Sequence, residues 1–432
     1  MKIIRLFLVL SMAAALTACA PSPGRATYVA SSLDGKFTVE WMDLVCRLIR
    51  DEVKSPLEAS RVIAYSGVAL YESCLPGMTG YRSLSGQLNG MPPMPLPDAA
   101  VSYDWPTVVS AAMSETLRGF FEGSEKAGAA IKRLKEGQLA GRYAPGEIRN
   151  RSEAYGKSLA GAVLTWASAD GFKETRSLPY TPPAGAGMWT PTPPAFNPPL
   201  EPHWGSLRAF VPGSLDAGFP PAPVPYSADK DSAFYREAMA VYQASKSLTD
   251  EEIATALFWA DDPGRSFTPA GHWLSIANQL VVLLNLQAGP AAELYALAGI
   301  ASADAFISCW HTKFLYNVQR PVTYINANID PGWQSALFTP SFPEYTAAHS
   351  VVSEAIASVL DRLLGEVRFT DNSYPDSGMA PRVFNSFEEA AREGAMSRLY
   401  GGIHYPFSIE QGLEQGKAIG ENTLNKVQTR TK

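Results

Sequence analysis

Apolar and polar residues alternate along most of the chain with the 3.6-residue period of an α-helix. The first apolar stripe at this spacing runs from Phe37 to Ile49. A second begins after Ser55 and Pro56, a pair typical of a helix start. Because strand-like alternation is scarce, the sequence predicts an all-α protein. Further helices are expected at 105–121, 124–138, 146–169, 228–244, from Thr249 with Glu252 as its capping-box partner, and at 269–286, 290–298, 301–319, 347–364, 386–400 and 408–427.

A proline-rich segment at 176–226 separates two sets of predicted helices. Its paired prolines, such as Pro193-Pro194 and Pro220-Pro221, exclude both a regular helix and a central strand. The segment also contains many Trp, Phe and Leu residues, so we expect it to be ordered and to wrap around the helices. We therefore predict a single large domain at 37–432, in which N-terminal helices at 37–175 pack on a second set at 227–432.

The N-terminus has the pattern of a secretory signal. Lys2 and Arg5 precede an apolar stretch at 6–16, which is too short to span a membrane. The stretch leads into Thr17 and Ala18, small residues directly followed by Cys19. The pattern predicts a signal peptide at 1–18.

Cys19 in this position resembles the lipidated cysteine of the bacterial lipobox, so we expect it to become the lipid-modified N-terminus of a tether at 19–36. The alternative is an ordinary signal peptide whose cysteine is accidental. By resemblance to the usual sorting pattern, Ala20 favours the outer membrane of the bacterial cell envelope. No other window is apolar for long enough to suggest a membrane span.

Charge and cysteine content narrow the classes of function. The net charge of -6 argues against a nucleic-acid surface, so an anion site requires a local cluster of cations. Besides Cys19 the chain has Cys46, Cys74 and Cys309. An exported protein permits one disulfide, for which Cys46 and Cys74 are the natural pair, but unpaired thiols fit equally well.

Three short stretches in the last third of the chain suggest where a cluster of cations for an anion site lies. In the first, Lys313 and Arg320 are seven residues apart, which places both on one face of a helix that Pro321 ends. Their neighbours are mostly apolar, and buried cations need an anionic partner.

The second stretch predicts a helix start at Thr346, a good N-cap, with Ala347, Ala348 and His349 in the first turn. Free amides and the positive end of the helix dipole there form an oxyanion site beside an imidazole. In the third stretch, Arg398 lies in the last turn of a helix that Ser386 and Glu389 cap. His404 follows after two glycines that end this helix.

In order and spacing these stretches resemble the signature of the type 2 phosphatidic acid phosphatase superfamily. That signature has a lysine followed after six residues by Arg-Pro, then Pro-Ser-Gly-His, then Ser-Arg with a histidine six residues after the arginine. Within the superfamily, this long chain looks like a vanadium-dependent haloperoxidase. The resemblance implies an all-α, vanadium-chloroperoxidase-like helical bundle with its oxyanion site in the helices at 227–432.

The resemblance also implies residue roles. His404 would bind the vanadium of vanadate, or form phosphohistidine in a phosphatase, and His349 would be the catalytic acid–base group. The oxyanion would be bound by Lys313, Arg320, Arg398 and the amide of Ala348. Trp310 and Phe342 would form the halide pocket, and a phenylalanine at 342 looks more like the chloroperoxidases.

One residue departs from the family pattern. Ala347 stands where the family has a serine, so one hydroxyl donor to the oxyanion is missing. Losing such a bond to a charged oxygen weakens binding by about 1.5–3 kcal/mol.

Three functions remain open at this stage. The favoured one is a vanadate-dependent haloperoxidase that uses hydrogen peroxide to oxidise a halide to hypohalous acid. The alternative is an acid phosphomonoesterase that hydrolyses a phosphate ester in the same pocket. The third is a non-catalytic oxyanion-binding surface lipoprotein. His272, near Asp261 and Asp262, either lines the pocket or is structural, and both readings stand.

Overall fold

The computed structural model describes residues 33–431, which are mostly helical, as predicted. The predicted signal peptide, the lipidation of Cys19 and most of the tether lie outside the described residues. The described helices are α1 (Lys36–Asp51), α2 (Pro56–Cys74), α3 (Trp105–Phe120), α4 (Glu125–Leu139), α5 (Gly146–Ser168), α6 (Phe172–Arg176), α7 (Ser214–Ala217), α8 (Ala233–Lys246), α9 (Asp250–Phe258), α10 (Thr268–Leu283), α11 (Ala288–Tyr316), α12 (Pro321–Asn328), α13 (Ala348–Leu364), α14 (Phe387–Tyr400) and α15 (Pro406–Lys426).

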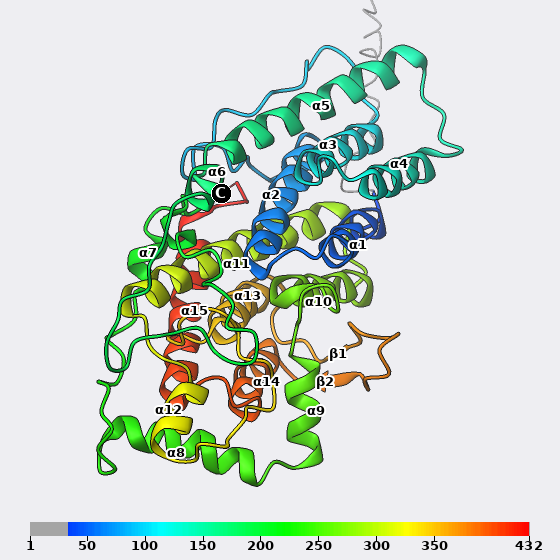
Figure 1. Cartoon of the computed structure of the whole chain (residues 1–432). Coiled ribbons are helices and arrows are strands. Elements are labelled where there is room, and N and C mark those ends of the chain that lie inside the picture. The colour runs from blue at the N-terminus through cyan, green and yellow to red at the C-terminus, as the bar shows by residue number, and fades with distance from the viewer. Residues whose placement is uncertain (1–32, 432) are drawn as a thin grey trace, which may run out of the picture.

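The helix α11 runs through the middle of the molecule, between the N-terminal helices and the site-bearing helices (Figure 1). It replaces the two helices expected at 290–298 and 301–319. By length and hydropathy it would suffice to cross a membrane, contrary to our expectation from the sequence, but its apolar window is completely buried inside the protein. A helix that is apolar all round has no amphipathic period, which is why the sequence pattern placed a false break in it.

The helices α2 and α11 pack very closely because glycines stand at their contact. A Cβ atom at Gly67 would lie 2.6 Å from the carbonyl oxygen of Tyr295, and one at Gly299 would lie 3.1 Å from the Cα of Ala64. The start of α2 has the capping box of Ser55 and Glu58. The N-terminal helices therefore rest directly on the helix that carries Lys313.

The helices α13, α14 and α15 form the other side of the core (Figure 1). Gly412, Gly416 and Gly420 recur every four residues along α15, and a Cβ at Gly416 would lie 2.3 Å from the carbonyl oxygen of Val351. A two-stranded antiparallel hairpin, β1 (Phe369–Asp371) and β2 (Arg382–Phe384), joins α13 to α14 and pairs Phe369 with Phe384. This hairpin places the buried side chain of Asp371 against α10.

The proline-rich segment begins where α6 ends and contains only the short helical turns η3 (Trp204–Ser206) and α7; η2 (Leu75–Gly77) is another such turn, earlier in the chain. It is tied to the helices by backbone hydrogen bonds, from the Trp189 amide to the Asn317 carbonyl (2.7 Å) and from the Leu200 amide to the Ser341 carbonyl (2.8 Å). The buried carboxylate of Asp304 on α11 accepts from the amides of Phe210 and Val211. These contacts hold the proline-rich segment against the helices. The division of residues 37–432 into N-terminal helices, proline-rich segment and site-bearing helices stays a prediction.

Two local details complete or correct the expectations from sequence. Of the two alternatives for the cysteines, the structure has unpaired thiols, because Cys46, Cys74 and Cys309 are buried and free. The last helix begins at Pro406 with Tyr405 as its N-cap, two residues earlier than expected, because proline at N1 already has helical φ.

Candidate active site

Lys313 and Arg320 do not share a helix face, contrary to our prediction. The helix α11 ends at Tyr316 because Asn317 takes the left-handed conformation (φ 47°), and Arg320 is the N-cap of α12. The two cations nevertheless converge on the segment 342–346.

Lys313 holds this segment through its ammonium group. The Nζ atom donates to the carbonyl oxygens of Pro343 (3.0 Å), Glu344 (2.9 Å) and Thr346 (2.5 Å), so backbone acceptors take all three of its protons. Burial lowers the pKa of Lys313 to about 8. In this arrangement Lys313 shapes the loop before α13 and has no proton left for an oxyanion.

Arg320 is completely buried and faces the imidazole of His404. Its Nε donates to the Phe342 carbonyl (2.9 Å), and its Nη1 donates to the Ile403 carbonyl (2.9 Å) and lies 3.2 Å from Nε2 of His404. Its Nη2 has no hydrogen-bond partner although it is buried. An unpaired buried guanidinium nitrogen is costly, so this atom marks a place where an anionic oxygen would be stabilised.

The ring of His404 is oriented by Glu344. Its Nδ1 lies 2.7 Å from Oε1 of Glu344, which also accepts from the Tyr405 amide (3.0 Å). Because this oxygen is an acceptor, Nδ1 carries the proton and Nε2 presents a lone pair. Burial, together with the charges of Arg320 and Lys313, holds the pKa of His404 well below its usual range. His404 is thus a neutral imidazole whose unprotonated Nε2, 3.2 Å from Nη1 of Arg320, is the nitrogen that can act as a ligand.

Glu344 is a functional residue that the sequence analysis missed. Burial raises the pKa of its carboxyl to about 7, although Lys313 and Arg320 lower it. The available signal was the charge balance, since two buried cations require a nearby carboxylate and Glu344 lies in the same short stretch as His349.

His349 lies in the first turn of α13, as predicted, but the cap differs. The N-cap is Ala347, without a side-chain cap bond, because the Thr346 hydroxyl donates to Oε1 of Gln415 (2.5 Å) instead. The Nε2 of His349 lies 3.2 Å from Oδ2 of Asp261. Burial and the charge of Arg398 lower the pKa of His349 to about 4, so the ring is neutral at neutral pH.

Arg398 lies in the last turn of α14 and reaches the same place. Its Nη2 donates to the Trp259 carbonyl (2.7 Å), its Nε contacts the Ser397 hydroxyl (3.1 Å), and its Nη1 lies 3.4 Å from Nδ1 of His349. These anchors fix the guanidinium plane and leave its Nη1 facing the ring of His349.

A cavity of about 200 Å³ joins these groups. Its polar wall consists of Asp261, Asp262, Ala348, His349, Arg398 and His404, and its apolar wall includes Leu200, Leu337, Phe338 and Phe342. Trp310 lies behind Phe342, with ring centroids 4.7 Å apart, and its indole nitrogen donates to the Leu200 carbonyl, so it is not part of the lining. Of the predicted halide residues, only Phe342 meets the cavity.

The donor set fits an oxyanion bound to an imidazole. His404 and Arg398 line the cavity beside His349 and Ala348 at the start of α13, and Arg320, whose Nη2 is unpaired, lies directly behind Nε2 of His404. Helix-terminal amides and guanidinium groups are the donors that tetrahedral oxyanions prefer. The fold and the site together define an all-helical protein with a histidine-based oxyanion pocket.

Comparison with known proteins identifies the family. Residues 293–432 match the VCPO second helical-bundle domain. The crystal structure of the first bacterial vanadium-dependent iodoperoxidase is 36% identical, covers 93% of this chain and 98% of its own, and superposes with a TM-score of 0.85. The chain therefore belongs to the vanadium-dependent haloperoxidases, as its motifs predicted.

More distant structures share the fold. A holo-type bacterial vanadium-dependent chloroperoxidase is 17% identical over 94% of this chain and 96% of its own (TM-score 0.63). An apo-type one is 16% identical over 85% and 92% (TM-score 0.65). No curated protein sequence matches the chain.

Proposed function

We propose that the chain is a vanadate-dependent haloperoxidase that converts hydrogen peroxide, a halide ion and a proton into hypohalous acid and water. The observation that carries the proposal is the unprotonated Nε2 of His404, whose ring is held by Glu344 and which lies against the guanidinium of Arg320 with its unpaired Nη2. When bound, vanadate supplies a Lewis acid that makes a peroxide oxygen electrophilic without changing oxidation state.

Each residue has a defined task in this proposal. His404 ligates vanadium through Nε2, and it is the only ligand that we assign to the metal. Arg320, Arg398 and the Ala348 amide bind the oxyanion oxygens, while Lys313 acts indirectly by holding the loop at 343–346.

His349 moves the proton. Because Asp261 accepts from Nε2, the other ring nitrogen, Nδ1, is unprotonated and can take a proton from hydrogen peroxide and later return it to the leaving oxygen. Its lowered pKa of about 4 keeps the ring unprotonated and ready for the first step.

The same pKa makes the haloperoxidase reaction the first to test at neutral pH. A phosphatase needs His349 protonated, so that it can donate to the leaving alcohol, and acidic pH or the negative charge of a bound phosphate would favour that form. The haloperoxidase reaction begins with the neutral form, which is the form that this pocket favours.

The test is iodide oxidation by hydrogen peroxide, followed as triiodide, with purified protein before and after addition of orthovanadate. Iodide is the first halide to try because the 36% identical relative is an iodoperoxidase. We expect activity only with vanadate, and none in His404→Ala. Activity that is independent of vanadate, or unchanged in His404→Ala, would refute the proposal. Vanadate binding without oxidation of iodide or hydrolysis of a phosphate ester would identify the non-catalytic lipoprotein.

We also propose that residues 1–18 are removed on export and that Cys19 is lipidated, which would anchor the enzyme in the bacterial outer membrane. Metabolic labelling with a fatty acid should mark the protein, and Cys19→Ser should remove the label and release the protein from membranes. Label retained in Cys19→Ser would contradict this assignment.

A further inference from the structure

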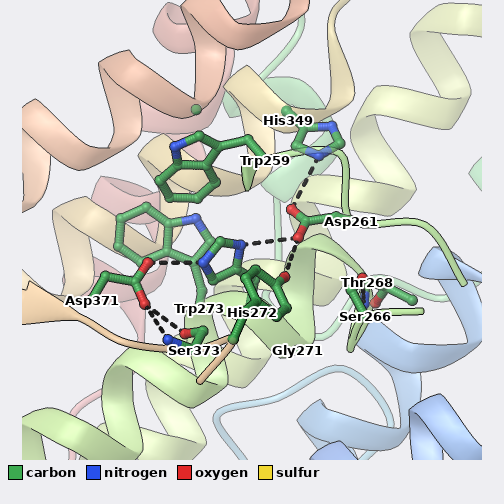
Figure 2. Close-up of polar contacts among 12 residues, drawn as sticks. Trp259, Asp261, Ser266, Thr268, Gly271, His272, Trp273, His349, Asp371 and Ser373 are labelled. Carbon is green, nitrogen blue, oxygen red and sulfur yellow. Dashed lines mark hydrogen bonds and ion pairs between the residues drawn. The ribbon is translucent and has the colours of Figure 1, made fainter. Parts of the chain in front are cut away.

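The candidate acid–base residue His349 is connected through Asp261 to a second buried histidine (Figure 2). On α10, His272 is completely buried, with Nδ1 2.9 Å from Oδ1 of Asp261 and Nε2 2.8 Å from Oδ2 of Asp371. Asp261 comes from the segment between α9 and α10, and Asp371 comes from β1, which is 99 residues after His272 in the sequence.

Both carboxylates are committed as acceptors. Oδ1 of Asp371 accepts from the amide and the hydroxyl of Ser373 (3.0 and 2.6 Å), and Oδ1 of Asp261 accepts from the Tyr374 hydroxyl (2.5 Å). A ring nitrogen that faces a carboxylate on each side must donate on each side, which only the doubly protonated imidazolium does.

The surroundings of His272 support this charge. The indole of Trp259 is stacked on its ring with the centroids 4.4 Å apart, the geometry of a cation–π contact. Burial lowers the pKa of His272, but Asp261 and Asp371 outweigh burial and raise it to about 10. His272 is therefore a cation in a place without solvent.

The cation has a direct effect on Asp261. Two carboxylates in a dry interior do not both stay ionised unless a positive charge compensates them. With His272 charged, Asp261 remains a carboxylate, and its Oδ2 presents only an acceptor to Nε2 of His349. The proton of His349 is then fixed on Nε2, and Nδ1 is unprotonated, with Nη1 of Arg398 3.4 Å away.

We propose that His272 is a positioning residue: as a permanent cation clamped between Asp371 and Asp261, it keeps Asp261 ionised and so fixes the tautomer and the orientation of His349. The expected effect of His272 on turnover rests on the proposed haloperoxidase function. The expected tautomer of His349 does not depend on that function. The charged or titratable groups that act on His349 are Asp261, Arg398, His272 and His404.

The arrangement exceeds what packing alone requires. A buried trio of two carboxylates and one imidazolium is no more stable than an apolar trio of similar volume, so stability is weak grounds for its presence. The trio reaches the cavity wall through the hydrogen bond that Nε2 of His349 donates to Oδ2 of Asp261.

The test reads protonation directly. The chain has five histidines, so ¹⁵N-histidine labelling of the purified, vanadate-free protein gives few signals, which single substitutions assign. At pH 7 we expect both nitrogens of His272 to be protonated, and His349 to carry its proton on Nε2 alone. In His272→Gln we expect the His349 signals to show a mixture of tautomers.

Kinetics with vanadate and iodide provide the second measurement. Loss of a supporting partner to a catalytic histidine lowers activity about 10–100-fold, and we expect His272→Gln to lower kcat by this factor with little change in the KM for iodide. Asp371→Asn keeps the His272–Asp261 pair and should have a smaller effect.

Asp304→Asn is the matched control, because Asp304 is another buried carboxylate with three donors, among them the Ser214 hydroxyl (2.6 Å). It should leave the His349 signals and kcat unchanged.

A single protonated nitrogen on His272 at pH 7, or an unaltered His349 tautomer in His272→Gln, would overturn the proposal. If His272→Gln does not fold, the wild-type and Asp371→Asn spectra decide. If the spectra are as expected but the wild type oxidises no halide, the positioning role of His272 is confirmed and the proposed haloperoxidase function is wrong.

Discussion

The replacement Ala347→Ser would give the site the serine hydroxyl that the signature Pro-Ser-Gly-His has at this position. Ala347 is completely buried and is the N-cap of α13, but it has no side chain that can cap. A serine hydroxyl there can accept from a free amide of the first turn and, with its own proton, donate to an oxyanion oxygen. Both effects follow from one added atom and are measured separately.

The two magnitudes can be estimated. An N-cap serine in place of alanine stabilises a helix by about 0.5–2 kcal/mol. A hydrogen bond to a charged oxygen contributes about 1.5–3 kcal/mol, which corresponds to roughly 10–150-fold in affinity. We therefore expect the orthovanadate Kd to fall by one to two orders of magnitude and the free energy of unfolding to rise by about 1 kcal/mol.

The assay is calorimetric titration with orthovanadate, combined with urea denaturation of the same samples. Ala395→Ser is the control, because Ala395 belongs to the same buried apolar cluster as Ala347, with Ile409 and Leu413, but lies inside α14. Its hydroxyl gains no cap, so it should reduce stability and leave the Kd unchanged. A Kd in Ala347→Ser within twofold of the wild-type value would refute the assignment of this position to the oxyanion site.

Three further predictions concern charge and packing. Glu344→Gln replaces the carboxyl acceptor of His404 and should weaken orthovanadate binding by roughly 10-fold in the same titration. Unchanged affinity would show that Glu344 does not orient the imidazole of His404. His272, whose folded pKa of about 10 exceeds its ordinary value, contributes stability that is present below pH 6.5 and is lost as the pH rises through 10. The difference in unfolding free energy between wild type and His272→Gln should therefore shrink from pH 7 to 10 in urea titrations, and a constant difference would contradict the charged state. Gly67→Ala places a Cβ 2.6 Å from the Tyr295 carbonyl and should lower stability by about 1–3 kcal/mol, whereas Gly128→Ala, an open helical position, should not.

The fold was predictable wherever a helix has one apolar face. Most helices at the surface of the core match the expected ranges, including the capping box of Thr249 and Glu252. The pattern failed in the fully buried α11, where every face is apolar. It also failed at Thr346, whose hydroxyl is taken by Gln415, a residue 69 positions away in the sequence.

The site was predictable as far as it lies in short motifs. His349, Arg398 and His404 meet as expected, because their spacing to helix ends fixes where they lie. The roles of Asp261, Asp371 and Tyr374 were not predictable, because they reach His272 from a loop and a hairpin that have no periodic signal. Lys313 was correctly located, but its three backbone acceptors become visible only when the loop at 343–346 is folded.

The close glycine contacts between α2 and α11 have a consequence for how the protein unfolds. The match to the helical-bundle domain at 293–432 begins inside α11, so this match cuts through a helix that packs against the N-terminal helices. Expressed by itself, that piece would expose the apolar surface that α2 covers, on a helix with the hydropathy of a membrane span. We therefore expect the N-terminal helices and the helices at 293–432 to unfold in one cooperative transition. The N-terminal helices keep the apolar surface of α11 covered until that transition.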